Sequence, residues 1–553
     1  MKRNQTVDHL LVLPILFVLI IPFIKLFLMS VKGDGLISNY GEVFSDPRVV
    51  EGIANTLIIG LVTSALTVIL GTYLAFVIAY TNIKFKRILK VLVYLPFIVP
   101  GYIMTLAWTN ITSSVGMVTK ILARLGLAPI NLYSMGGIIF VMTLCYIPFV
   151  YLSVYRSLIK VPLSSEYASH LLNYGVLETF RKINLRQIRP TLVSTFVLVF
   201  LSSLDNFSIP AFLGVSAGIP VLSTLIYEKT ISVSTGGFTS PAVLSVLLFV
   251  ISVSISQTEG QILKRARTGK DAREDKSVRY AFPAAVRRAV EILTFSALIF
   301  INIVPIGFMV YSSFISNYVR EFSLANFSLD NYRGLFSISS IKMSMTNSLT
   351  YALITVVICA LLSLVYGYFK WKDRYPRSMS LLEKGTSISY SLPGMVLALS
   401  MIFHWAKPIP WLNFGFYGGP GIILIAYVTR FLIIDMKAAH QAFGAMSHNL
   451  EYAALLSDSS FFKKWFKIFL PLIYKYILTS SLLIFVYSLT ELSLSAMLSG
   501  PYTKTIGLFI FNLQQAGDYS LAYAMSTLVL ILLLLLYLLM EKINGGERID
   551  SFN

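Results

Sequence analysis

The sequence is poor in charge, cysteine and histidine, and each shortage excludes a class of protein. Only 13% of the 553 residues are charged, whereas 56% are hydrophobic; a soluble domain has roughly a quarter charged residues. A conventional soluble enzyme is therefore excluded. The two cysteines, Cys145 and Cys359, both lie in apolar segments and indicate neither a disulfide nor a cysteine-based metal site. The five histidines show no metal-ligand spacing, so we expect no metal site.

The charges that are present favour one sign. Lysine and arginine number 45 against 26 aspartates and glutamates, a net charge of +19. In a nucleic-acid-binding protein such an excess forms a patch on a polar domain, but here the basic residues punctuate long apolar runs. This distribution is typical of membrane proteins, whose cytoplasmic loops carry Lys and Arg. We therefore expect membrane lipid around the chain and no nucleic-acid partner.

Apolar runs long enough to cross a bilayer recur along the whole chain. They predict an all-α integral membrane protein with about twelve transmembrane helices. No small-residue cleavage site follows the first run, so we interpret it as a helix rather than a signal peptide. Prolines within the runs should kink the helices: Pro96, Pro100, Pro148 and Pro393. The runs lie near 10–30, 53–80, 91–113, 134–156, 191–213, 241–258, 290–312, 345–369, 386–406, 417–437, 472–496 and 521–541.

The positions of the basic residues predict the orientation. With the N-terminus placed inside, most of the 45 lysines and arginines fall in the predicted inside loops, the linker and the tails. The positive-inside rule then places both termini in the cytoplasm, which agrees with an even number of spans. We expect a multi-pass protein of the bacterial cytoplasmic membrane.

The chain contains an internal repeat. The segments 39–44 and 331–336 match, and the spans that follow open with Asn55-Thr56-Leu57 and Asn347-Ser348-Leu349. A second match runs without gaps from Glu166–Leu213 to Glu451–Leu498. Each copy has an even number of spans, so the copies are parallel repeats about an axis along the membrane normal.

This repeat predicts the domain organisation. We expect a first half at 1–258, a basic cytoplasmic linker at 259–289 and a second half at 290–553, with each half containing six transmembrane helices. The linker mixes charges of both signs with almost no apolar periodicity, and we interpret it as a solvated hinge. Recognition of anionic lipid by its basic residues is the alternative.

A polar segment interrupts the membrane pattern at the same place in both halves. It lies within the inside loops 157–190 and 441–471, and each copy begins with Glu-Tyr-Ala. The pattern predicts a short amphipathic helix, a break and a second helix. The breaks fall at 173–175 and 457–459, where Asn173 and Asp458 tolerate a left-handed backbone.

These segments resemble the cytoplasmic loop of permease subunits of binding-protein-dependent ABC importers. The signature of that family is Glu-Ala-Ala, a glycine a few residues on, and then Ile-x-Leu-Pro. Asn173 and Asp458 replace the glycine, and Arg186 replaces the first copy's proline, although Pro190 fits a common second proline. The matching residues are Glu166, Ala168, Ile183 and Leu185 in the first copy and Glu451, Ala453, Ala454, Ile468, Leu470 and Pro471 in the second.

Two further segments narrow the resemblance to fused permeases similar to the ferric-iron importers. Residues 203–214, with Ile226-Tyr227, look like the region after the loop in the first half of that group. Residues 489–492, with 496–498, look like its counterpart in the second half. The resemblance covers nearly the whole chain and implies the type I ABC importer permease fold.

The resemblance also implies a mechanism and partners. Each loop provides a coupling helix that docks into one of two copies of an ATP-binding subunit, and an extracytoplasmic solute-binding protein delivers the cargo. Tilting of the halves then gives alternating access. The residues assigned to coupling are Glu166, Tyr167, Ala168, Asn173, Gly175, Ile183, Leu185, Glu451, Tyr452, Ala453, Ala454, Asp458, Ile468, Leu470 and Pro471. We expect Glu166, Glu451 and the basic residues of both loops to give charge complementarity.

Neither a catalytic centre nor a nucleotide site is visible. The single Gly-Lys pair, Gly269-Lys270, lacks the glycine and the Ser or Thr of a phosphate loop. We therefore expect no catalytic residues and no cofactor in this chain, and ATP and Mg on the partner ATPase.

Ionisable residues inside predicted spans are costly and so are functional candidates. Asp205, Asn206 and Glu491 occupy nearly matching repeat positions and are candidates for the pathway or its outer gate, where they favour a cationic cargo. The alternative is that they cap or brace helices. Arg430 and Asp435 lie five residues apart on one predicted helix and pair with each other or with neighbouring helices.

Our leading hypothesis is a fused permease of an ABC importer whose cargo is ferric iron, or else a phosphonate, thiamine or a polyamine. The contrasting hypothesis is a secondary transporter driven by an ion gradient. It predicts membrane-embedded carboxylates or discontinuous helices, but gives no reason for the paired loops. A lipid-modifying membrane enzyme needs clustered His, Asp or Glu near an interface, and we find no such cluster in the sequence.

Overall fold

The computed structural model describes residues 2–33, 35–232, 237–266, 274–315, 326–407, 416–447, 449–450 and 460–543. Helices form the fold of this part of the chain, and its β contacts are two isolated bridges, Thr81 with Tyr280 and Ile315 with Phe327. The predicted all-α fold class is therefore confirmed. The predicted coupling residues Glu451, Tyr452, Ala453, Ala454 and Asp458 lie outside the described residues.

The first half begins with two helices that form one bent span and ends with a long helix that leads into the linker. Its elements are α1 (Lys2–Leu19), α2 (Ile21–Ser30), α3 (Leu36–Ser45), α4 (Pro47–Tyr80), α5 (Lys86–Ile98), α6 (Gly101–Thr112), α7 (Met117–Arg124), α8 (Met135–Leu158), α9 (Leu163–Leu171), α10 (Val176–Thr179), the π-helical turn η1 (Phe180–Asn184), α11 (Leu185–Asp205), α12 (Ser208–Ala217), α13 (Leu222–Ile231) and α14 (Thr239–Ala266).

The second half repeats this order. Its elements are α15 (Ala284–Leu298), the π-helical turn η2 (Ile299–Ile303), α16 (Val304–Ser313), α17 (Asp330–Ser337), α18 (Ser339–Trp371), α19 (Pro376–Ser391), α20 (Gly394–Trp405), α21 (Pro420–Gly444), α23 (Phe461–Lys464), the π-helical turn η4 (Trp465–Phe469), α24 (Leu470–Thr490), α25 (Ser493–Leu498), α26 (Ile506–Ala516) and α27 (Tyr519–Ile543). The turns η1 and η4, and the 21-residue helices α11 and α24, begin and end at positions that the gap-free sequence register pairs.

Among the described residues, eight helices are long and apolar enough to cross a membrane, or up to twelve if each bent helix pair is one span. Two of the four prolines expected to kink helices lie at bends between helices: Pro100 in the 104° bend between α5 and α6, and Pro393 in the 120° bend between α19 and α20. In contrast, α8 continues through Pro148 and α5 through Pro96.

One predicted span needs correction. The apolar run 191–213 suggests a single helix, but α11 ends at Asp205 and the chain breaks at Asn206-Phe207. The helices α12 and α13 then form a further pair, bent by 74°. The predicted spans 191–213 and 241–258 leave all of α13 in the stretch between them.

The repeated Asn-Tyr motif makes the same contacts in both halves. The Asn39 side chain donates to the carbonyls of Ser30 (3.0 Å) and Lys32 (2.8 Å), and thereby holds the end of α2. The Asn331 side chain donates to the carbonyls of Ser313 and Ile315, both at 2.9 Å, at the end of α16. In each half, these hydrogen bonds hold the end of the first span against the short helix that follows it.

The second repeated motif, at 55–57 and 347–349, also makes the same contact in both halves. Thr56 Oγ1 accepts a hydrogen bond from the backbone N–H of Leu222 at the start of α13 (2.8 Å). At the matching place in the second half, Ser348 Oγ accepts from the backbone N–H of Ile506 at the start of α26 (2.8 Å). A hydroxyl is required at both positions because it satisfies a buried backbone donor.

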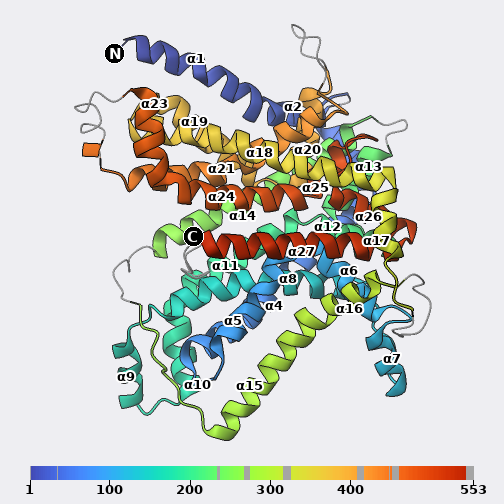
Figure 1. Cartoon of the computed structure of the whole chain (residues 1–553), viewed down its shortest axis with the longest axis vertical. Helices are drawn as coiled ribbons and strands as arrows, with labels where there is room; N and C mark the ends of the chain where they lie inside the picture. Colours follow the sequence, from blue (N-terminus) through green and yellow to red (C-terminus); the bar gives the residue numbers. More distant parts are fainter. Residues whose placement is uncertain are drawn as a thin grey trace.

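The halves interlock by exchanging their first spans. In the first half, α1 packs against α19 and α2 against α20, both of which belong to the second half. In the second half, α15 contacts α5 and α16 packs against α6. Figure 1 shows α9, α10, α23, the start of α1 and the end of α27 at one end of the bundle, on the left, which we name the loop end. The helices α7, α13, α17 and α26 lie at the opposite end.

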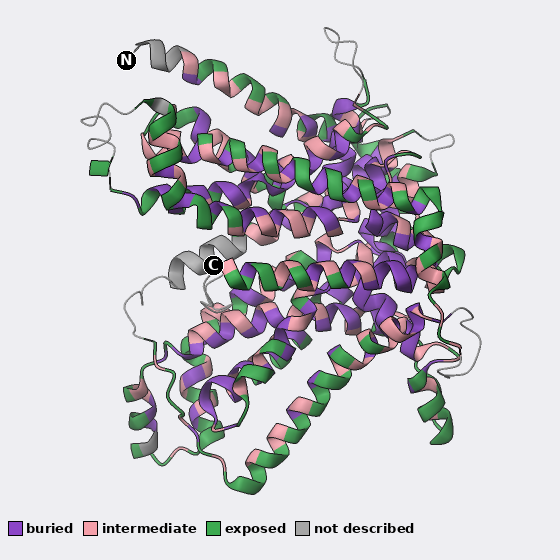
Figure 2. Ribbon diagram, in the orientation of Figure 1, coloured by how far each residue is buried: buried purple, intermediate pink, exposed green. Residues whose placement is uncertain are grey.

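Burial follows the expectation for a membrane bundle. Figure 2 shows buried residues concentrated between the long helices and exposed residues along their outer faces. Those outer faces are apolar, as at Leu61 and Ile69 on α4 and Leu353 and Val357 on α18. Exposed leucine and isoleucine at regular helical spacing are suited to contact with lipid hydrocarbon.

Candidate functional site

The first predicted coupling loop protrudes at the loop end of the bundle (Figure 1). The helix α9 ends at Leu171, and a turn leads to α10. Asn173 has the left-handed backbone conformation that the sequence predicted, with φ of 55°. Gly175 has a φ of −72°, so its freedom as a glycine is not used here.

The protruding loop presents apolar side chains that contact little of the chain. Leu171 is 86% exposed, and Tyr167, Leu172 and Leu177 are also exposed; we call these four residues the loop patch. Ala168 and Gly175 lie in the same exposed loop, whereas Ile183 and Leu185 are half-buried at its base. An exposed apolar group on a loop is typical of an interaction surface.

Glu166, in contrast, faces inward. It is only 3% exposed. Its Oε1 accepts a hydrogen bond from Arg279 Nη1 at 2.6 Å and another from the Asn184 side chain. Charge complementarity with an outside partner therefore does not hold for Glu166 in this structure, because its charge is compensated within the chain.

The partner of Glu166 comes from the linker between the halves. The Arg279 side chain is 0% exposed; its Nη2 donates to the carbonyl of Val161 (2.7 Å), and its guanidinium lies 4.5 Å from the centre of the Tyr80 ring. The solvated-hinge interpretation is thus wrong at Arg279, whose side chain is buried, and at Tyr280, which is buried as a whole. The pattern offered one weak signal, since Val278 and Tyr280 flank this arginine in an otherwise charged stretch.

The base of the second loop has a different chemistry. Position 469 matches position 184 in the repeat, and the buried Phe469 replaces the buried Asn184. Among the described residues of this loop, Ile468 and Leu470 are half-buried and Pro471 is exposed. An aromatic cluster surrounds the base: Tyr368, Trp371, Phe443, Trp465 and Phe469.

Sequence reasoning missed the π-helical turns η1 and η4. Each turn lies between a loop and the long helix that follows, so the same uncommon local geometry occurs in both halves. Single π turns often occur at functional sites. Neither turn carries a composition signal that distinguishes it from the adjoining α-helices.

A second group of charged residues connects the two halves inside the bundle. Asp205, at the end of α11, accepts a hydrogen bond from Arg430 at 2.7 Å and another from the backbone N–H of Gly394 at 2.7 Å. The Arg430 side chain is 9% exposed, near the middle of α21. Of the two pairings open for Arg430, the structure thus shows the one with a neighbouring helix. Asp435 instead accepts from Ser481 of α24 (3.1 Å).

Asn206 and Glu491 cap short helices at matching positions of the repeat. Asn206 Oδ1 accepts from the backbone N–H of Ile209 at the start of α12, and Glu491 Oε1 accepts from that of Leu494 at the start of α25, both at 3.0 Å. Glu491 also interacts electrostatically with Arg430. Each residue therefore stabilises the first turn of a short helix, as the capping alternative expected.

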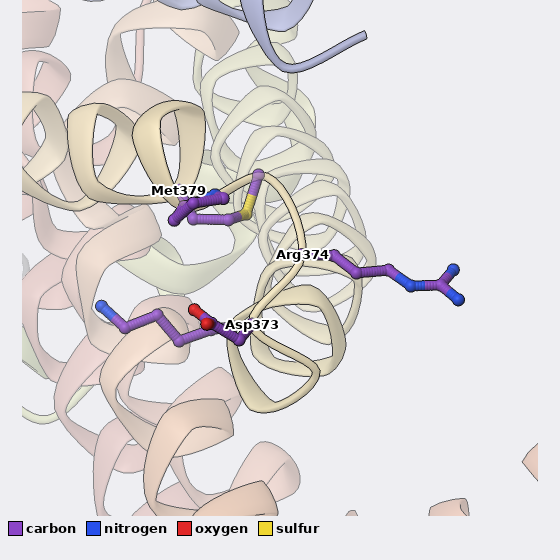
Figure 3. Close-up of a pocket in the computed structure, with 5 residues that line it drawn as sticks. Asp373, Arg374 and Met379 are labelled. Carbon is purple, nitrogen blue, oxygen red and sulfur yellow. The ribbon is translucent and has the colours of Figure 1, made fainter. Parts of the chain in front are cut away.

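A small cavity lies at the turn between α18 and α19. It has a volume of about 230 Å³ and is lined by Lys370, Asp373, Arg374, Pro376 and Met379. Figure 3 shows that the Arg374 side chain extends away from it. Lys370 forms an ion pair with Glu383, so its charge is already compensated. Among the described residues, no three His, Cys, Asp or Glu side chains are grouped as metal ligands.

Comparison with known proteins gives a family. The profile of the binding-protein-dependent transport system inner membrane component matches the chain twice, at residues 67–258 and 380–545. These two segments contain α11 and α24, which the internal repeat pairs. The match covers most of the chain and was found independently in each half.

Relatives of full and of half length are found. A ferric transport system permease protein of Actinobacillus pleuropneumoniae is 27% identical over 98% of this chain and 78% of its own length. A putative ferric transport system permease protein of Haemophilus influenzae is 28% identical over 87% of this chain and 76% of its own. A putative 2-aminoethylphosphonate permease of Salmonella typhi is 24% identical over 41% of this chain and 79% of its own. This chain therefore belongs to the family of binding-protein-dependent transport system inner membrane components, as a fused permease with two copies of the family domain.

Proposed function

We propose that this chain is the translocation subunit of an ATP-driven importer and that its cargo is ferric iron. The family supports the class of transporter. The two ferric permeases match most of the chain at 27% and 28% identity, and this likeness supports iron as the cargo.

The loop patch carries the proposal. An ATP-binding subunit docks on Tyr167, Leu171, Leu172 and Leu177, which protrude while Glu166 anchors the loop from behind. The exposed Arg181 lies close by in sequence and provides a charge that steers the encounter, whereas Lys182 is paired with Glu178. The second loop, at 441–471, receives the other copy of the subunit, and each copy binds ATP and Mg.

The proposed orientation follows from the proposed docking site. The loop end faces the cytoplasm, so both termini are cytoplasmic, and a solute-binding protein meets the opposite end. ATP-driven approach of the two ATPases tilts the interlocked halves, so that the pathway between them opens alternately to either side.

The ion pair between Asp205 and Arg430 is the proposed gate. It joins α11 of the first half to α21 of the second, and so must break if those helices separate. Asp205 and Glu491 outnumber the single guanidinium by one charge, which favours a cationic cargo. Asn206 adjoins the pair and holds α12 beside it.

The docking proposal is tested by binding. We expect Leu171→Glu to weaken binding of the candidate ATPase at least tenfold, because it places a charge in an apolar contact. The matched control is Ile37→Glu on α3, which alters an equally exposed apolar residue outside the loop. Equal ATPase binding by the wild type and the Leu171→Glu protein would contradict the proposed docking site.

The cargo is tested separately. The solute-binding protein that stimulates ATP hydrolysis by the complex is purified, and its bound ligand is identified by mass spectrometry and elemental analysis. Ferric iron is expected. A bound phosphonate, thiamine or polyamine would overturn the assignment of iron and keep the transporter class.

A further inference from the structure

We propose that the linker between the halves clamps the first coupling loop, with Arg279 as the positioning residue that holds α9 in its docking orientation. The inference rests on the proposed function for the meaning of docking, but the clamp itself is a property of this chain alone. Arg279 acts through Glu166, and neither residue belongs to the exposed loop patch.

Hydrogen bonds attach the linker backbone to the first half at Asp275, at Arg279-Tyr280 and at Phe282, which bonds the Asn82 side chain. The Asp275 N–H donates to the carbonyl of Ile159 at 2.7 Å, just after α8. The N–H groups of Arg279 and Tyr280 both donate to the carbonyl of Tyr80 at 2.9 Å, at the end of α4. These bonds hold the linker against α4 and α8 of the first half.

The Arg279 side chain then connects this fixed backbone to the loop. One guanidinium nitrogen bonds the Glu166 carboxylate and the other bonds the Val161 carbonyl, on either side of the start of α9. The face of the guanidinium rests on Tyr80. A planar guanidinium with several donors is suited to fixing several groups at once, and a lysine ammonium reproduces only part of this geometry.

The helix α9 depends on such contacts for its position. It has nine residues, and an isolated helix of that length is marginal in water. Its two buried polar residues face the base of the loop: Glu166 bonds Arg279 and Asn184, and Ser169 Oγ lies 2.9 Å from Thr179 Oγ1. The four residues of the loop patch are exposed and so contribute little to holding α9 in place.

The clamp also connects the loop to the second half. Beyond the linker, α15 contacts α5, and Glu291 of α15 accepts a hydrogen bond from the backbone N–H of Lys84 (2.7 Å). Residues 280–283 are the only ones between Arg279 and the start of α15, so a movement of the first span of the second half acts on Arg279 over this short stretch, in which Phe282 bonds Asn82. The two loops are coupled differently, since aromatic packing at Phe469 replaces the polar base at Asn184.

The first test measures the chain without its partners. Backbone hydrogen exchange over residues 163–175 is compared in lipid nanodiscs for the wild type, Arg279→Ala and the control Lys276→Ala, whose linker side chain is 59% exposed. We expect exchange in this segment to rise at least tenfold in Arg279→Ala only. Unchanged exchange would overturn the clamp, whether or not the chain is an importer.

The second test separates positioning from a general structural role. Arg279→Lys retains the charge and is expected to give exchange between those of the wild type and Arg279→Ala. Tyr80→Phe retains the ring but loses the hydroxyl that bonds the Leu158 carbonyl, and we expect it to raise exchange less than Arg279→Ala does. These milder variants keep the test decisive if Arg279→Ala does not fold. With the ATPase bound, Arg279→Ala should lower solute transported per ATP at least threefold, while Lys276→Ala does not. If Arg279→Ala transports as much solute per ATP as the wild type, the positioning role is overturned. If the wild type binds no ATPase, the proposed function is overturned, but the hydrogen-exchange result still tests the clamp.

Discussion

At the residue scale, the roles of the charged side chains depend on partners far away in the sequence. Glu166 begins the polar segment that marks the loop, and its position there was found from the sequence. Its role was not, because Arg279 lies in a stretch with no apolar periodicity. A buried carboxylate needs an opposite charge or several donors, and the folded chain supplies both.

The ion pair between Asp205 and Arg430 leads to a prediction on stability. Arg430→Met leaves the Asp205 carboxylate without its cation, and we expect a loss of about 2 kcal/mol, below the 3–5 kcal/mol of fully buried pairs because Asp205 is partly exposed. Adding Asp205→Asn should restore about 1 kcal/mol. Thermal unfolding in detergent measures both, with Arg124→Met at the end of α7 as the control.

The result that would contradict this prediction is additivity. If Asp205→Asn and Arg430→Met lower stability by amounts that simply add in the double variant, then the two residues do not act as a pair. The proposed gate would then lose its physical basis.

At the element scale, turns and caps decide where helices begin and end, and short local signals reveal only some of them. The breaks at Pro100 and Pro393 were predictable because proline removes a backbone donor. The end of α11 at Asp205 was not, since the apolar run continues through it. The π turns η1 and η4 were missed because their composition does not distinguish them from the adjoining α-helices.

The turn after α9 gives a prediction on backbone conformation. Asn173 has a left-handed backbone, so Asn173→Gly, which restores the residue of the family signature, should leave ATPase binding unchanged. Asn173→Val should destabilise this turn by about 1–2 kcal/mol, because a β-branched residue is strained there. Binding of the candidate ATPase by both variants is the measurement, and equal binding by Asn173→Val would count against the turn.

A pH dependence follows from the start of α4. A hydrogen bond from Lys229 holds the pKa of Asp46 below its usual value. Because the folded pKa is the lower one, the stabilisation is complete above the unfolded value of about 3.9 and is lost as the pH falls through the folded value. The melting temperature of Asp46→Asn should therefore lie below that of the wild type at pH 6 and approach it below about pH 4. A difference that grows in acid would contradict this assignment.

At the scale of the whole molecule, the repeat made most of the fold predictable. Matching motifs at Asn39 and Asn331, and at Asn55 and Asn347, have matching contacts, so the similarity of the halves in sequence reflects similarity in structure. The exchange of first spans between halves was not predictable, because both packing choices bury apolar helices equally well. The linker clamp was missed for a related reason: composition does not show which charged segment finds a buried partner.

The interlocked halves lead to a prediction about cutting the chain. The first span of each half packs on the other half, so the segments 1–272 and 273–553, expressed together, should assemble into one complex. Expressed alone, each should be less stable, because its first span loses its contacts with the other half and keeps only those of α2 with α14 or of α16 with α27. Co-purification through a tag on one segment is the measurement, and two segments that are each as stable alone as together would contradict the exchange.

The central claim is that ATP hydrolysis by a partner drives transport through this chain. The most direct measurement is uptake of ferric iron into vesicles that contain the purified chain, with its solute-binding protein outside the vesicles. The ATPase and ATP are supplied on the side of the loop end. We expect uptake only when the ATPase and ATP are both present, and no uptake from a proton or sodium gradient alone. Uptake driven by such a gradient without any ATPase would contradict the account and favour a secondary transporter.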